Sequence, residues 1–236
     1  SAFLLKKLTL RPEWMSTVFV HHPPAALAIL LSSKTRIEKM VAFGGLVAIS
    51  LGIGLAAASG FRVFLPPMLL SGAINIGLIE ASGELSMLDG WVAFSVLFAA
   101  VVLEIGSYLI PWLDNLLDVV ATPAAVLAGV GMMGAVIGAE TDYDPIIQWA
   151  IATIGGGGVA GTVQTGTVAT RALSTGTTGG LANPIISVVE AVMAIVVTVL
   201  ALLAPFLCLV LVCAGCFYAL RMIGRVGNKS KVAPMA

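Results

Sequence analysis

Residues 184–205 read PIISVVEAVMAIVVTVLALLAP, a run of apolar side chains interrupted by a single charge, Glu190. The apolar pattern continues beyond Pro205 as far as Leu220. An α-helix rises about 1.5 Å per residue, so the run from Pro184 to Leu220 is longer than a perpendicular crossing of a bilayer core of about 30 Å requires. Pro205 interrupts helical hydrogen bonding near the middle of this run. The run is therefore either one kinked, tilted helix or two membrane spans.

The composition of the whole chain agrees with a membrane location. Of the 236 residues, 59% are hydrophobic and 10% are charged, whereas soluble domains contain about 25% charged residues. A chain of this length keeps a large outer surface even when folded, and charged residues normally make that surface wettable. The outer surface here must face lipid, and we expect an all-α, polytopic transmembrane helical bundle.

Apolar segments of suitable length predict about six spans. The first five are expected at 40–59, 63–79, 91–110, 124–139 and from residue 146 onward, and the last is the run described above. Basic residues gather before the first span and after the last. By the positive-inside rule, both chain ends then lie in the cytoplasm. The expected parts are an interfacial, processed or extension segment (1–39), a transmembrane domain (40–222) and a basic cytoplasmic tail (223–236).

Prolines predict where several of these helices begin or end. Pro66 and Pro67 favour a helix start or a break early in the second span. The third span should stop at Pro111. Thr122 and Pro123 are typical of an N-cap followed by the first helical residue, and they predict the start of the fourth span.

Between the third and fourth spans, residues 112–121 predict a helix on the membrane surface. Asp114 and Asp118 are four residues apart, so they share one helix face, and leucines and a valine occupy the other. Such a face could hold a cation, but it is also typical of the wet side of an interfacial helix.

Two segments of unusual composition follow. The run Gly155–Gly158 predicts close contact with another helix backbone, because small residues allow helices to approach within a membrane. Residues 161–183 contain many threonines and glycines. We expect this segment to lie outside the membrane, or to be irregular or re-entrant and to line a cavity.

Charged groups within apolar helices need a physical reason, since each costs roughly 2.5–3.5 kcal/mol on membrane insertion. One interpretation is a polar cavity that binds a solute or ion or relays a proton. The other is that arginines pair with carboxylates to hold helices together, or that the charges reach the interface. The candidate binding residues are Arg62, Glu104, Asp114, Asp118, Arg171, Thr175, Asn183 and Glu190.

No enzyme signature, metal site or cofactor site is predicted. The sequence has no HExxH, P-loop or GxSxG motif. His21 and His22 are adjacent and would point in different directions from a helix, which disfavours a shared metal. Cys208, Cys213 and Cys216 lie in the last apolar run and are interpreted as packing residues. Zero formal net charge gives no reason to expect a nucleic-acid partner. We expect membrane lipids and a second copy or another membrane protein as partners.

Several blocks of sequence in order resemble a known family. They are 56–67 (AAASGFRVFLPP), 82–85 (SGEL), 103–104 (LE), 110–118 (IPWLDNLLD) and 121–123 (ATP). These blocks resemble the bacterial membrane family called domain of unknown function 4126, over about residues 40–215. The resemblance implies a bacterial inner-membrane location and draws attention to Arg62, Glu104, Asp114, Asp118 and Arg171. Residues 1–39 look like an addition to the family pattern.

The leading functional hypothesis is a small transporter or channel, expected to form a homo-oligomer, for a small solute or ion that could be anionic. Arg62 and Arg171 would bind an anionic group, and hydroxyls of the threonine-rich segment would complete the site. A non-catalytic scaffold or assembly subunit is the second hypothesis, in which the charges are structural. An intramembrane lipid-modifying enzyme is the third.

Overall fold

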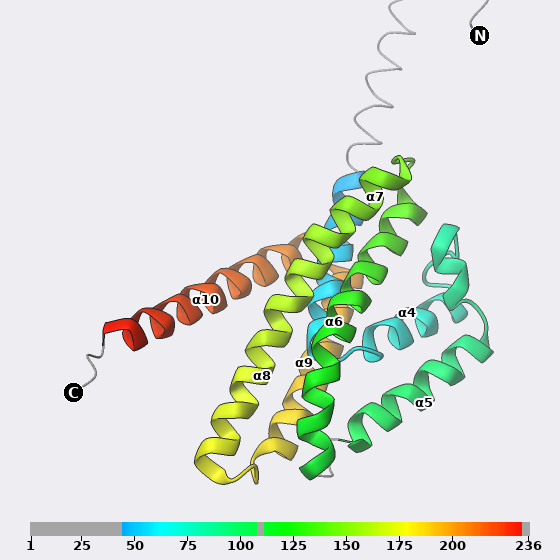
Figure 1. Ribbon diagram of the computed structural model, residues 1–236. Helices are drawn as coiled ribbons and strands as arrows, with labels where there is room; N and C mark the ends of the chain where they lie inside the picture. The colour runs from blue at the N-terminus through cyan, green and yellow to red at the C-terminus, as the bar shows by residue number, and fades with distance from the viewer. Residues whose placement is uncertain (1–43, 108–110, 233–236) are drawn as a thin grey trace, which may run out of the picture. The chain divides into compact units, whose positions relative to one another are not determined.

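The computed structural model describes the backbone of residues 44–107 and 111–232, and the side chains of 44–107 and 120–221. The predictions for residues 1–39, including His21 and His22, lie outside these ranges. The described elements are all helices (Figure 1), which confirms the all-α expectation.

Four of the described helices are long and apolar enough to cross a membrane, and they are Gly44–Phe61, Val120–Glu140, Pro145–Thr178 and Asn183–Leu203. Trp91–Ser107 and Pro205–Arg221 are shorter apolar helices. The chain is thus a helical membrane protein, while the count of six spans stays a prediction. Helix α4, Leu65–Asn75, has 11 residues and at about 1.5 Å per residue is too short to cross a bilayer alone.

Helical structure is interrupted between the first described helix and α4. The helix Gly44–Phe61 ends, and α4 begins at Leu65 with prolines in its first turn. This confirms the helix start predicted from Pro66 and Pro67. Helix α4 lies against α5, Trp91–Ser107, and the short 3₁₀ helix η1, Gly83–Leu88, connects this pair (Figure 1).

Helix α6, Pro111–Glu140, overturns the predicted boundary at Thr122 and Pro123. It is one continuous helix of 30 residues with Pro123 inside it, so residues 112–121 are not a separate helix. A proline removes only one N–H from a helix, and within a membrane bundle the surrounding helices can compensate for that loss. The local sequence is typical of a helix start, but the helix continues through it because α6 packs against its neighbours.

The glycine run packs against α6 as predicted. Helix α7, Pro145–Ile151, continues through a π-helical segment η2, Ala152–Gly157, into α8, Gly158–Thr178. A Cβ atom built on Gly129 of α6 would lie 2.7 Å from the carbonyl oxygen of Gly156, and a Cβ on Gly156 would overlap the Gly129 carbonyl. Each backbone therefore occupies the space that a side chain on the other would need.

The threonine-rich segment is a regular helix, contrary to the expectation of irregular or re-entrant structure. Its hydroxyls donate to carbonyls four residues earlier, for example Thr162 to Gly158 over 2.8 Å and Thr165 to Gly161 over 2.7 Å. These bonds satisfy the polar groups within the helix itself, so the backbone has no need to leave helical geometry. Helix α8 ends at Thr178, and its C-cap is Gly179, whose φ of 64° is left-handed.

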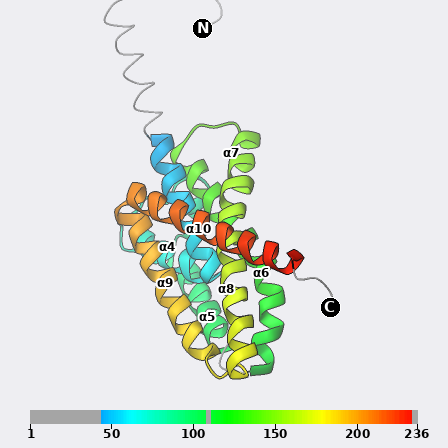
Figure 2. The same cartoon turned by 90° about the vertical axis from the view of Figure 1, so that its left-hand side faces the viewer.

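The last apolar run forms two helices. Helix α9, Asn183–Leu203, ends at Ala204, whose φ of −146° and ψ of 68° are not helical. Helix α10 then runs from Pro205 to Val232. It contacts α9 and α8, and Figure 2 shows it passing across both.

Polar residues of α9 face inward, and many of its apolar residues face outward. The buried residues of α9 are Asn183, Ser187, Glu190, Ala194, Thr198 and Ala201. Outward positions of the same helix include Val188, Val192 and Val199, at 59%, 51% and 42% exposure. Such an arrangement suits a helix whose outer face contacts lipid, because polar side chains then pair inside the bundle.

Candidate functional site

A charged cluster lies inside the bundle, where three helices meet. Arg62 follows the first described helix, Arg171 belongs to α8 and Glu190 to α9, and their exposed fractions are 1%, 3% and 5%. Sequence analysis selected each residue separately, and the structure brings the three side chains together.

Glu190 is the shared partner of the two arginines. Arg171 Nε donates to Glu190 Oε1 over 3.1 Å, and Arg171 Nη2 donates to Glu190 Oε2, so this pair is bidentate. Arg62 Nη2 lies 3.5 Å from Glu190 Oε2. A planar guanidinium matches a carboxylate in this way, and the match gives strength and a defined orientation.

Arg62 is also held by the backbone and side chain of α9. Its Nη2 donates to the carbonyl oxygen of Ser187 over 2.7 Å and to Ser187 Oγ over 2.5 Å. Ser187 and Glu190 are successive residues on the inward face of α9. The guanidinium of Arg62 therefore ties the end of the first described helix to this face.

Thr175 and Asn183 form a second connection between α8 and α9. Asn183 Nδ2 donates to Thr175 Oγ1 over 3.2 Å. Thr175 lies about one turn after Arg171, and Asn183 lies about two turns before Glu190. The pair thus lies between the charged cluster and the α8–α9 turn, and positions the two helices rather than joining the cluster.

Glu104 accepts hydrogen bonds from the backbone at the helix break before α4. Its Oε1 accepts from the backbone N–H of Val63 over 2.8 Å, and its Oε2 accepts from that of Phe64 over 3.2 Å. These two N–H groups lie outside regular helix, so the carboxylate of α5 supplies partners that the backbone lacks. Asp114 and Asp118 lie on α6, and their side chains are outside the described ones.

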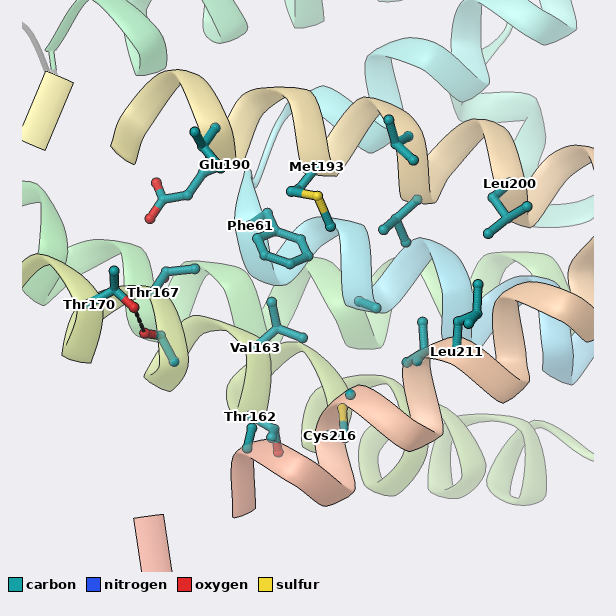
Figure 3. Close-up of a pocket in the computed structure, with 18 of the residues that line it drawn as sticks. Phe61, Thr162, Val163, Thr167, Thr170, Glu190, Met193, Leu200, Leu211 and Cys216 are labelled. Carbon is teal, nitrogen blue, oxygen red and sulfur yellow. Dashed lines mark hydrogen bonds between the residues drawn. The ribbon is translucent and has the colours of Figure 1, made fainter. Parts of the chain in front are cut away.

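A cavity of about 630 Å³ adjoins the charged cluster. Its walls come from the first described helix, α8, α9 and α10, and are mostly apolar, with valine the commonest residue. In Figure 3, Glu190 lies at one end opposite Thr167 and Thr170, and Leu200 and Leu211 lie toward the other. Neither Arg62 nor Arg171 is among the lining residues, so Glu190 separates the arginines from the cavity.

Sequence analysis missed Ser187 and the lining residues of α10, and it included Thr167 only as part of the threonine-rich segment. The signal that could have singled out Ser187 and Thr167 is periodicity. The polar and small residues of α9 recur at spacings of three and four, and Gln164, Thr167, Arg171 and Ser174 do so on α8. Such spacing puts residues on one helix face.

A second buried polar group lies away from the cluster. Gln148 of α7 donates through Nε2 to Glu84 Oε1 over 3.0 Å and to the Gly134 carbonyl over 2.9 Å. It joins η1, α6 and α7 and has the character of a structural connection. Within the part of the chain that the structure describes, no three His, Cys, Asp or Glu side chains gather as metal ligands.

Comparison with known proteins gives a family and no function. The model of the family described as "domain of unknown function 4126" matches residues 49–225, which include the charged cluster and all residues that line the cavity. No curated protein and no solved structure matches the sequence. The matched range covers most of the chain, and the chain therefore belongs to the membrane family called domain of unknown function 4126.

Proposed function

We propose that this protein is a small membrane transporter whose solute site combines the cavity with the Arg62–Glu190–Arg171 cluster. The observation that carries the proposal is the burial of these charges in apolar helices directly beside a cavity. Buried charges are costly in a membrane, and they commonly mark solute and ion pathways.

The broken helix next to Arg62 supports the same proposal. Transporters often place non-helical backbone at membrane depth, where it borders the solute site. Residues Val63 and Phe64 form such a break, braced by Glu104, and Phe61 just before it lines the cavity. A brace on a neighbouring helix couples any movement of α5 to the residues beside the site.

An arrangement with one carboxylate and two guanidiniums also offers a way to switch. Glu190 contacts Arg171 through two bonds and Arg62 through a longer approach of 3.5 Å. A solute that competes for Glu190 would weaken the connection between α8, α9 and the first described helix. Binding would in this way favour a different arrangement of the same helices.

The contacts of Arg62 and Arg171 support an anionic solute less than the sequence alone did, because the sequence does not reveal that both arginines share a carboxylate. Both guanidiniums engage Glu190, and the carboxylate is the charged group that lines the cavity. An anion would have to displace Glu190 to reach them. The bacterial inner membrane, cytoplasmic chain ends and a homo-oligomeric state remain parts of this proposal.

A scaffold is the second candidate, because Glu190 engages both arginines and so gives the charges a structural task. A lipid-modifying enzyme would need reactive groups near a membrane surface, for which Asp114 and Asp118 are the starting point. Accessibility of the cavity separates transport from scaffolding.

The test measures whether the cavity opens to both sides of a membrane. Cys208, Cys213 and Cys216 are replaced by alanine, and Thr170→Cys is introduced into the cavity wall. The full chain is reconstituted in sealed vesicles and treated with a membrane-impermeant thiol reagent from outside or inside. The matched control is Val188→Cys, which lies on the outer face of α9 and does not line the cavity.

A transporter should expose Thr170→Cys from both sides and leave Val188→Cys unmodified in lipid. Modification of Thr170→Cys from one side only, or from neither, contradicts alternating access and favours the scaffold. Gel filtration before reconstitution confirms that each variant is folded.

A further inference from the structure

We infer that the cavity binds an uncharged, single-chain amphiphile whose head group donates hydrogen bonds, such as a long-chain alcohol. The claim that this amphiphile is the transported substrate rests on the proposed function. The claim that the cavity binds it rests on the cavity alone.

The walls of the cavity select an apolar chain. The volume of about 630 Å³ lies within the range of about 300–1,000 Å³ typical of small-molecule sites. Met193, Val196, Leu200, Leu211 and Val212 supply much of the wall beyond the polar end. An apolar surface of this kind, among membrane helices, is best covered by a hydrocarbon chain, since water there would lose hydrogen bonds.

The polar end of the cavity offers acceptors. Thr167 Oγ1 donates its hydrogen to the Gln164 carbonyl over 2.9 Å, and Thr170 Oγ1 donates to the Gly166 carbonyl over 2.9 Å. A hydroxyl has one hydrogen and two lone pairs, so each threonine presents only an acceptor to the cavity. Thr162, which also lines the cavity, donates to the Gly158 carbonyl in the same way.

Glu190 adds a further set of acceptor oxygens at the same end (Figure 3). An ionised carboxylate has no hydrogen to donate. A ligand head that only accepts hydrogen bonds would therefore face lone pairs without a donor. The complementary head group carries an O–H or an N–H.

The charges around the cavity favour a head group that is a neutral hydrogen-bond donor. A carboxylate or phosphate head would meet the Glu190 carboxylate first and could reach the arginines only by displacing it, and it would lose its hydration on entering an apolar cavity. An ammonium head would lie near two guanidiniums that already share Glu190, and it would lose its hydration on entering an apolar cavity. A hydroxyl loses less hydration and makes the same donor bond.

The test uses a photoreactive dodecanol analogue, with a diazirine at the end of its chain, and the full-length protein in lipid nanodiscs. Cross-linked residues are identified by mass spectrometry. Competition compares four ligands with the same chain: dodecanol, dodecyl methyl ether, dodecanoate and dodecylammonium. The ether is the matched control, because it keeps the oxygen and lacks the donor.

We expect cross-links on the cavity walls of α9 and α10, and displacement by dodecanol at about tenfold lower concentration than by the ether, the effect of about one hydrogen bond. Equal displacement by the alcohol and the ether would overturn the donor requirement. Stronger displacement by the carboxylate or the ammonium would overturn the neutral head group.

Two substitutions on α8 test the location. Gly166 lines the cavity, and Gly158 does not, yet a Cβ on either glycine meets no atom within 4 Å. Gly166→Leu should fill the cavity and abolish cross-linking, whereas Gly158→Leu should leave it unchanged. Unchanged cross-linking in Gly166→Leu would show that the probe binds elsewhere.

The outcome is separable from that of the transport test. Loss of two-sided access with retained alcohol binding would remove the transport proposal and keep the binding site. Two-sided access without selective alcohol binding would keep transport and remove this ligand class.

Discussion

Arg171 and Glu190 are 19 residues apart in the chain and joined by two hydrogen bonds, one of them from Nε to Oε1 over 3.1 Å. The pair connects the antiparallel helices α8 and α9 across the α8–α9 turn. Both side chains are almost fully buried, so neither charge has water as an alternative partner. This relationship makes Glu190 the residue on which the charged cluster depends.

Glu190→Gln should destabilise the protein strongly. The substitution keeps the size of the side chain and removes the charge that both buried guanidiniums contact. Removing one partner of a buried ion pair costs about 3–5 kcal/mol, because the remaining charge stays buried without compensation. Thermal unfolding of the purified protein, followed by gel filtration of the heated sample, measures the loss.

The matched control is Glu140→Gln at the exposed end of α6. Exposed substitutions of this kind change stability by about 0.5 kcal/mol or less. Equal stability of Glu190→Gln and Glu140→Gln would show that the buried pair contributes little.

Gly156→Ala should destabilise the contact between η2 and α6. The added methyl group would overlap the Gly129 carbonyl, and Met133 Cβ lies 2.9 Å from the same position. Overpacking of a tight contact costs about 1–3 kcal/mol. Gly158→Ala is the control, because no atom lies within 4 Å of its Cβ.

Alanine at Gly158 should leave the unfolding temperature unchanged or raise it slightly, since alanine favours a helix more than glycine does. If both alanine variants unfold at the wild-type temperature, the helices can separate without cost and the close packing is not important.

The sequence predicted the membrane fold because its evidence is local. A run of apolar residues identifies a membrane helix without knowledge of its neighbours. The helix start at Pro66 and the packing of the glycine run were predicted for the same reason, since proline and glycine act on their own backbone. At Pro123, contacts with neighbouring helices determine whether the helix continues. Local sequence reasoning therefore placed a helix boundary inside the continuous helix α6.

The residues of the charged cluster were selected from the sequence, and pairing of arginines with carboxylates was one of two interpretations, but the arrangement of the three side chains was not predicted. Arg62, Arg171 and Glu190 were selected because charges in apolar helices are costly. Their common contact could not be derived, because it depends on how α8 and α9 turn their faces toward the first described helix. Thr175 and Asn183 were assigned to the same site, whereas the structure gives them a separate bond near the α8–α9 turn.

Glu104→Leu should weaken the break before α4. The backbone N–H groups of Val63 and Phe64 would lose the carboxylate oxygens that accept from them. The Val63 donor is partly buried, and an unsatisfied buried donor costs about 1–3 kcal/mol, so the unfolding temperature should fall by part of that cost. Hydrogen exchange at Val63 and Phe64, measured by mass spectrometry, should become faster.

Leu103→Val is the control on the neighbouring residue. Leu103 is 70% exposed on α5, and its side chain accepts no backbone hydrogen bond. Exchange at residues 63–64 should stay at the wild-type rate in this variant. Unchanged exchange in Glu104→Leu would show that the carboxylate does not brace the break.

Arg171→Lys tests whether the geometry of the cluster matters as well as its charge. Lysine keeps the positive charge but cannot reproduce the planar bidentate contact with Glu190. The expected loss of stability is about 1.5–3 kcal/mol, the value of one charge-assisted hydrogen bond, and therefore smaller than that of Glu190→Gln. Arg221→Lys, an exposed substitution on α10, should have no effect on stability.

In the vesicle experiment, the weaker connection between α8 and α9 in Arg171→Lys should change the rate at which Thr170→Cys is modified from the two sides. Arg221→Lys should leave this rate unchanged. If Arg171→Lys lowers stability and leaves both rates unchanged, the cluster holds the helices together without taking part in opening the cavity.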